Sequence, residues 1–84
     1  MTSLTLAGRT WTVGALPARL RAQIDQLGPP TEAPDDETLW RVAFVVWQAI
    51  RIVDPIDRAD FVSLPFSNAE LLTAFAGLRN VGHG

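Results

Sequence analysis

The acidic residues come nearest to a reactive or metal-binding pattern. Residues 35–37 are consecutive acids, and Asp54, Asp57 and Asp60 recur at every third position. Carboxylates at such spacings could supply oxygen ligands to a divalent cation. An EF-hand loop would also require a central glycine and a terminal glutamate, and neither follows here. We therefore expect these acids to be helix caps and solvated loop charges, with no metal site.

Nucleophilic and redox chemistry have little basis in this composition. The chain has no cysteine, which excludes disulfides, thiolate catalysis and cysteine-based zinc sites. Its one histidine, His83, lies in a predicted frayed tail, where a general base would lack fixed geometry. There is no glycine-rich phosphate loop and no nucleophile elbow. The sequence predicts a non-enzymatic protein without a cofactor.

Charge and hydropathy limit the classes of partner that the chain could bind. Seven arginines are scattered among nine acids, giving a net charge of −2 without a basic run, so we expect no nucleic-acid partner. The first ten residues lack the basic and apolar regions of a signal peptide. The apolar stretch over residues 39–53 is interrupted by Arg41, Gln48 and Arg51, and it is too short to cross a bilayer. We expect a soluble cytoplasmic protein with no membrane partner.

A β-hairpin is predicted over residues 3–13. Apolar and polar residues alternate there, so one face would carry Leu4, Leu6, Trp11 and Val13. A type II′ loop at Gly8-Arg9 would place Leu6 opposite Trp11 and Leu4 opposite Val13. A lone hairpin is marginal in water, so its apolar face must pack on a helix or extend a partner's sheet.

The remaining chain predicts about three helices, which makes the fold α+β, mainly α. Residues 1–84 fit one small domain. After the hairpin we expect a helix over 17–27, a proline-rich acidic linker over 28–36, a central helix over 37–53, a loop over 54–66 with one helical turn near 58–61, a helix over 68–79 with a Ser67/Glu70 capping box, and a frayed tail over 80–84.

The central helix is apolar around most of its circumference. Twelve of the fifteen residues in 39–53 are apolar. The apolar arc covers roughly 280°, whereas a surface helix needs little more than about 100°. Phe44 even falls inside the remaining polar stripe. Either the hairpin and the other helices wrap this helix, or part of it meets another chain.

We assign the excess apolar surface to one aromatic edge. Trp40, Phe44 and Trp47 occur at i, i+4 and i+7, bordered by Arg41 and Arg51. Aromatic residues and arginine dominate the energetics of protein–protein interfaces. The sequence predicts that these five residues bind another protein, whereas the side chains expected to face the core are Val42, Val46, Ile50 and Val53. Small cysteine-free domains often complete their cores by association, so a homo-oligomer is also expected.

The order of these segments resembles a known family. A hairpin with a GR turn (LTLAGRTWTVGAL) precedes an amphipathic helix (PARLRAQIDQL), an acidic proline linker, an apolar helix and a closing helix (SNAELLTAFAGL). This layout is similar to that of the small tail assembly chaperones of long-tailed bacteriophages, or of related phage morphogenesis proteins. The resemblance covers most of the chain and rests on segment order rather than on a diagnostic motif.

The resemblance implies a non-enzymatic role in the host cytoplasm. Such chaperones bind the tape-measure protein, keep its apolar surface soluble and recruit tail-tube proteins, and they tend to self-associate. The family has no catalytic residues to transfer. Two other functions remain open: a structural virion component that adds its hairpin to a neighbouring sheet, and a phage-encoded inhibitor of a host protein.

Overall fold

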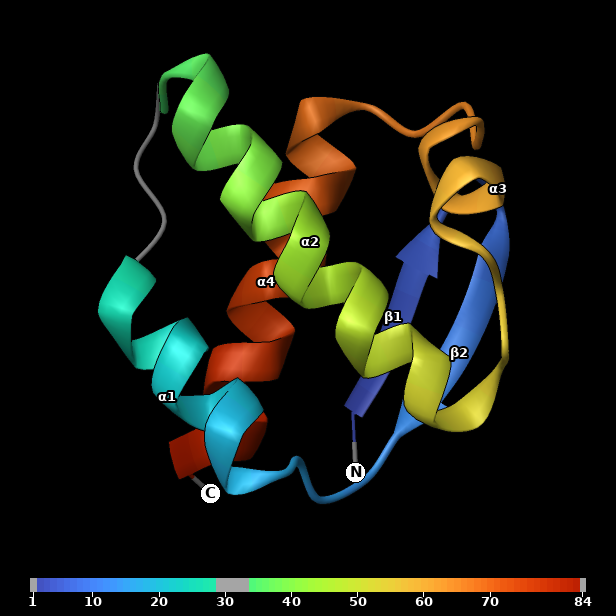
Figure 1. The fold of residues 1–84 in the computed structure, drawn as a ribbon. Coiled ribbons are helices and arrows are strands. Elements are labelled where there is room, and N and C mark those ends of the chain that lie inside the picture. Colours follow the sequence, from blue (N-terminus) through green and yellow to red (C-terminus); the bar gives the residue numbers. More distant parts are fainter. Residues whose placement is uncertain (1, 29–33, 84) are drawn as a thin grey trace.

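The computed structural model describes residues 2–28 and 34–83, with side chains to residue 80. The fold is α+β and mainly α, which confirms the predicted class (Figure 1). Its elements are β1 (Thr2–Leu6), β2 (Arg9–Val13), α1 (Ala18–Leu27), α2 (Asp36–Val53), α3 (Arg58–Val62) and α4 (Asn68–His83).

Helix α2 is the central element of the fold. It crosses the front of the molecule diagonally, with α4 behind it, α1 beside it and the hairpin beyond its other side (Figure 1). Helix α4 contacts β1, α2 contacts both β2 and α4, and α1 contacts both α2 and α4. The buried side chains form one cluster, to which the hairpin, the connecting segments and the helices α1, α2, α3 and α4 all contribute.

The hairpin has the predicted faces but a different register. Leu4, Leu6, Trp11 and Val13 are all buried. However, Leu4 pairs with Trp11 and Leu6 with Arg9, so the predicted pairing was wrong by two residues. The loop is Ala7-Gly8, and both residues have positive φ (53° and 78°), as a type I′ turn requires. A two-residue shift leaves every side chain on its original face, so the apolar pattern does not distinguish the two registers.

Several element boundaries also differ from the prediction. Asp36, assigned to the linker, is the first residue of α2, because Asp35 caps that helix by accepting a hydrogen bond from the Thr38 backbone N–H at 2.8 Å. Residues 29–33 of the predicted linker lie outside the described residues. The single turn expected near 58–61 is the short helix α3. The predicted frayed tail was wrong in part, since α4 continues to His83.

The N-terminus of α4 is fixed by two different hydrogen bonds. The Glu70 backbone N–H donates to Ser67 Oγ at 3.1 Å, as the predicted capping box requires. The Glu70 carboxylate, however, accepts from the Ala7 backbone N–H at 3.1 Å. Glu70 therefore joins the first turn of α4 to the hairpin loop, where Ala7 adopts an unfavourable positive φ.

The core-facing stripe of α2 is shorter than predicted. Val42, Val46 and Ile50 are buried, but Val53 is exposed, which corrects that part of the prediction. An 18-residue helix is about 27 Å long, and the longest dimension of the molecule is 29 Å. Helix α2 thus spans the whole molecule, and its ends reach the surface. No helix within 2–28 and 34–83 is long and apolar enough to cross a membrane.

A candidate protein-binding surface

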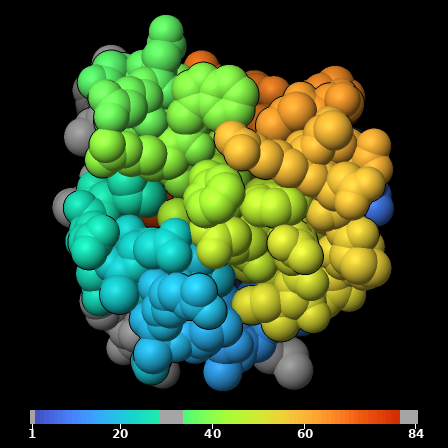
Figure 2. Space-filling view, viewed as in Figure 1, coloured from blue at the N-terminus to red at the C-terminus, as the bar shows by residue number. Residues whose placement is uncertain are grey.

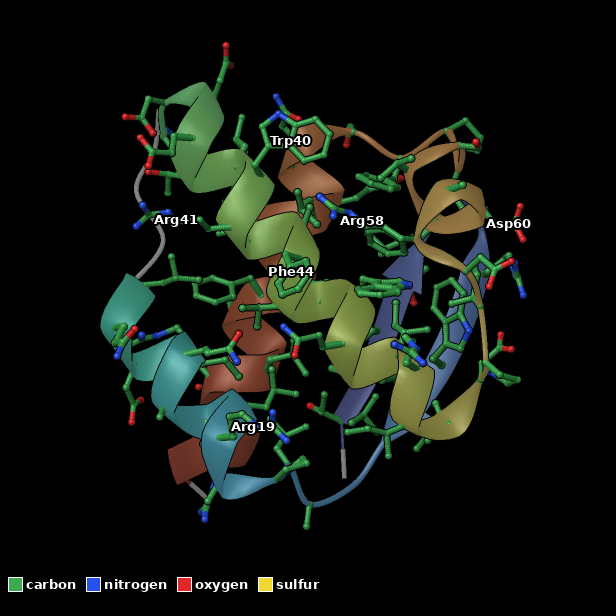
Figure 3. The ribbon with its side chains drawn as sticks, viewed as in Figure 1. Arg19, Trp40, Arg41, Phe44, Arg58 and Asp60 are labelled. Atoms are coloured by element: carbon green, nitrogen blue, oxygen red, sulfur yellow. The ribbon has the colours of Figure 1, made fainter. Side chains whose placement is uncertain are left out.

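Two aromatic side chains of α2 lie on the surface rather than in the core. Trp40 is 58% exposed and Phe44 is 40% exposed, and they are one helical turn apart. Figure 3 shows both side chains on the front of α2. We call this pair the aromatic ridge. Large side chains of this kind lose water-exposed area only if another molecule covers them.

Arg58 holds the aromatic ridge in place from α3. Its guanidinium lies 5.4 Å from the centre of the Phe44 ring and 6.0 Å from the centre of the Trp40 ring. Both distances are within the range of cation–π attraction. Figure 3 shows the Arg58 side chain beside α2, between the labelled aromatic residues and α3. The ridge is therefore exposed but in contact with Arg58, and such a contact restricts its side chains and reduces the conformational entropy lost on binding.

Trp47 supports the aromatic ridge from below rather than extending it. Its side chain is only partly exposed, and its indole N–H donates to the Ile56 carbonyl at 3.0 Å. Its ring lies 5.6 Å from the Phe44 ring at a tilted angle of 47°. Arg51 covers the Trp47 ring at 4.9 Å. Of the predicted aromatic edge, the structure thus places Trp47 next to the ridge as its inner support, and the exposed Arg51 lies over the Trp47 ring.

A groove separates the aromatic ridge from α1. Its volume is about 530 Å³, and we call it the α1–α2 groove. Figure 2 shows it as a hollow between the cyan atoms of α1 and the green atoms of α2. The residues that line it are Gln23, Gln26, Leu27, Glu37, Trp40, Arg41, Phe44, Val45 and Arg58. Arg41 is held at its rim by an exposed ion pair with Glu37 at 2.6 Å.

A second groove follows the other side of Trp40. This α2–α4 groove has a volume of about 330 Å³. It is lined by Asp36, Leu39, Trp40, Ala43, Val62, Phe66, Asn68 and Leu71. Trp40 borders both grooves, so the aromatic ridge is a projection between two depressions. This is the shape that interlocks with side-chain rows of another helix.

Two acidic residues have structural roles in the described part of the chain. Within the described residues, no group of three or more His, Asp or Glu side chains could hold a metal ion. Asp54 instead accepts a hydrogen bond from the Trp11 indole at 2.9 Å and faces Arg9 at 3.4 Å, which fastens the hairpin to the end of α2. Hydrogen bonds from Thr38 lower the pKa of Asp35, which has the structural role of a helix cap.

The sequence identified the α2 part of this surface but not its surroundings. Helical spacing is sufficient to place Trp40, Phe44 and Arg41 near one another. Arg58 and Val62 were missed because they reach the surface only after the chain reverses beyond α2. Pro55 signals that reversal without indicating where α3 will pack. The contribution of α1 was missed because it depends on how α1 packs against α2, which helical spacing does not reveal.

Comparison of the chain with protein-family models, with curated proteins and with solved structures gave no match. No relative therefore assigns a function, which has to be argued from the surface. An exposed aromatic ridge, grooves on both sides and nearby guanidinium groups are features of protein-binding surfaces rather than of reaction sites.

Proposed function

We propose that the chain is a non-enzymatic protein-binding module that uses the aromatic ridge as its main contact. The observation that carries the proposal is the exposure of Trp40 beside Arg58, between two grooves. Tryptophan and arginine are enriched among the few interface residues that dominate binding energy. An ordered tryptophan between two grooves offers such an anchor without reorganisation of the core.

The segment order favours a tail assembly chaperone of a long-tailed phage as the specific form of this module. The tape-measure protein is then the expected partner, with tail-tube proteins joining later. A largely helical client with exposed apolar rows suits a surface made of a ridge and two grooves. Assembly of this kind would take place in the host cytoplasm, and self-association remains a prediction.

Co-expression tests the proposal. The chain is tagged and produced together with the tape-measure protein of the phage that encodes it, and the complex is isolated. We expect co-purification with the unchanged chain, a strong loss with Trp40→Ser, and no loss with Ile52→Ser. Ile52 is a matched control because it is 49% exposed on the same helix but outside both grooves. Equal recovery with both variants would contradict the role of the ridge.

Gene position tests the phage assignment separately. A location between the tail-tube and tape-measure genes supports the chaperone, whereas a location far from any phage structural genes contradicts it. Light scattering after size-exclusion chromatography adds a further distinction. A closed homo-oligomer supports a chaperone or a virion ring, and a monomer together with a host target supports the inhibitor.

A further inference from the structure

We infer that the partner presents an amphipathic helix whose apolar stripe is flanked by acidic residues. This inference rests on the proposed protein-binding role of the aromatic ridge and specifies the chemistry of its partner. It is carried by two independent observations: the shape of the grooves, and two arginines beside the ridge, Arg51 and Arg58, that have no ion-pair partner among the described residues.

The shape favours a helix over an extended strand. The α1–α2 groove is lined entirely by residues of α1, α2 and α3. The α2–α4 groove is lined by residues of α2, α3, the segment that follows α3, and α4. A strand is recognised mainly through backbone hydrogen bonds at a sheet edge, and neither groove includes a residue of β1 or β2. Side chains repeating at i, i+3, i+4 and i+7 can fill the two grooves from either side of Trp40.

The charges beside the ridge select the flanking residues of that helix. Ion pairs between described side chains join Arg9 to Asp54 and Arg41 to Glu37, and they involve neither Arg51 nor Arg58. Both of those exposed guanidinium groups lie over aromatic rings and face no carboxylate at ion-pair distance among the described residues.

The charges that line the two grooves are mixed in sign, because Asp36 and Glu37 lie at the start of α2 and Glu37 is paired with Arg41. Arg58 is the lining cation that has no carboxylate at ion-pair distance among the described residues. Figure 3 shows Arg19, Arg41 and Arg58 on the same face as Phe44, whereas Asp60 projects from the outer side of α3 at the edge of the molecule. The net charge of the chain is −2. Attraction of an acidic partner therefore originates in this surface and not in the overall charge. Carboxylates beside the partner's apolar stripe would complete ion pairs with Arg51 and Arg58.

Two other occupants fit the surface less well. A second copy of the chain, related by a two-fold axis through the ridge, would bring the same arginines towards one another. Single-stranded nucleic acid would need free aromatic faces for stacking, but Arg58 already covers one face of each ridge residue. Both occupants are included as outcomes of the test.

The test uses two synthetic peptides in place of the unidentified partner. Both are fluorescein-labelled, helix-forming and free of tryptophan, and they share one leucine stripe at i, i+3, i+4 and i+7. One carries glutamate beside the stripe and the other carries lysine. Fluorescence anisotropy with the full chain gives each Kd at low and at physiological salt. We expect the glutamate peptide to bind about tenfold more tightly, with a smaller preference at higher salt.

Charge reversal identifies the residue responsible. We expect Arg58→Glu to lower affinity for the glutamate peptide about tenfold and to raise affinity for the lysine peptide, with Arg58→Gln between the two. Arg21→Glu is the matched control, because it changes the net charge by the same amount as Arg58→Glu. Arg21 lies about 160° around the α1 axis from Gln23, which lines the groove. Circular dichroism confirms that each variant is folded, which is expected since Arg58 is exposed.

The outcomes separate this inference from the function on which it rests. Equal binding of both peptides, or an equal effect of Arg58→Glu and Arg21→Glu, overturns the inference about charge. If Trp40→Ala still weakens binding in that case, the binding role of the ridge survives. Failure of both peptides to bind, tighter binding of a poly-dT oligonucleotide, or a dimer that is lost with Trp40→Ala also overturns the acidic-helix inference.

Discussion

Replacement of Trp40 by alanine should separate binding from folding. The indole is 58% exposed, so most of its area is available to a partner rather than to the core. A tryptophan side chain offers up to about 250 Å², and roughly 140 Å² of that is therefore uncovered. At about 25 cal/mol per Å², complete coverage by a partner would contribute at most ~3.5 kcal/mol.

The expected loss is smaller than this upper bound. Alanine retains some contact area, and a partner rarely covers every exposed atom, so we expect a loss of about 2–3 kcal/mol. That loss corresponds to a rise in Kd of roughly 100-fold. The free energy of unfolding should fall by only about 1 kcal/mol, because the aromatic ridge contributes little to the buried core.

Titration calorimetry with the partner and urea unfolding followed by circular dichroism measure the two quantities on the same samples. Ile52→Ala is the control, because Ile52 is similarly exposed on the same helix but roughly 18 Å further along its axis. We expect its Kd to equal that of the unchanged chain. If Trp40→Ala weakens binding no more than Ile52→Ala, or if it unfolds the protein, the reasoning about the ridge is refuted.

Three further predictions concern stability, measured as urea midpoints. A methyl group at Gly77, inside α4, would meet β1 side chains at an ordinary 3.7 Å, so Gly77→Ala should stabilise the fold by about 0.5–1 kcal/mol. Gly8→Ala should lower the midpoint, since the φ of Gly8 is +78°. A lower midpoint with Gly77→Ala would contradict the first expectation, and an unchanged or higher midpoint with Gly8→Ala would contradict the second. The pKa of Asp35 is lowered in the folded state, so the stabilising effect of its carboxylate is present above about pH 4 and is lost as the pH falls through the folded pKa. The Asp35→Asn variant keeps a capping side chain and should lose less stability than the unchanged chain between pH 7 and pH 3. An identical loss in both proteins would disprove this role of Asp35. Asp54→Ala should lower the free energy of unfolding by about 1–2 kcal/mol, because the Trp11 indole N–H loses its acceptor, and an unchanged midpoint would show that this bond is dispensable.

The elements that could be predicted are those determined by local patterns. Alternation placed Leu4, Leu6, Trp11 and Val13 on one face, and the Ser67 hydroxyl does cap α4. The hairpin register was not predictable from that alternation. It depends on hydrogen bonds such as that between the Thr5 and Thr10 hydroxyls, and on a long-range contact between Ala7 and Glu70. Contacts between residues distant in sequence leave no periodic signal.

The candidate site also combines features that local spacing predicts with features that depend on long-range contacts. Helical spacing correctly grouped Trp40 and Phe44, and it predicted that neither faces the core. It could not show that the indole N–H of Trp47 would find an internal acceptor at Ile56, which makes this residue a support of the ridge. Nor could it show that Arg58 would return from the next helix to cover both ridge rings. Those features depend on how α3 packs after the chain reverses.

The packing of β1 against α4 has a consequence for the order of events during synthesis. The hairpin is synthesised before α4, yet α4 is among the helices that cover its apolar face. A two-stranded hairpin alone is marginal in water, so part of its apolar face stays uncovered on the ribosome-bound chain until α4 emerges. A stop codon before Asn68 would leave that face permanently open, and the truncated product would be a substrate for proteases or aggregation rather than a weaker binder.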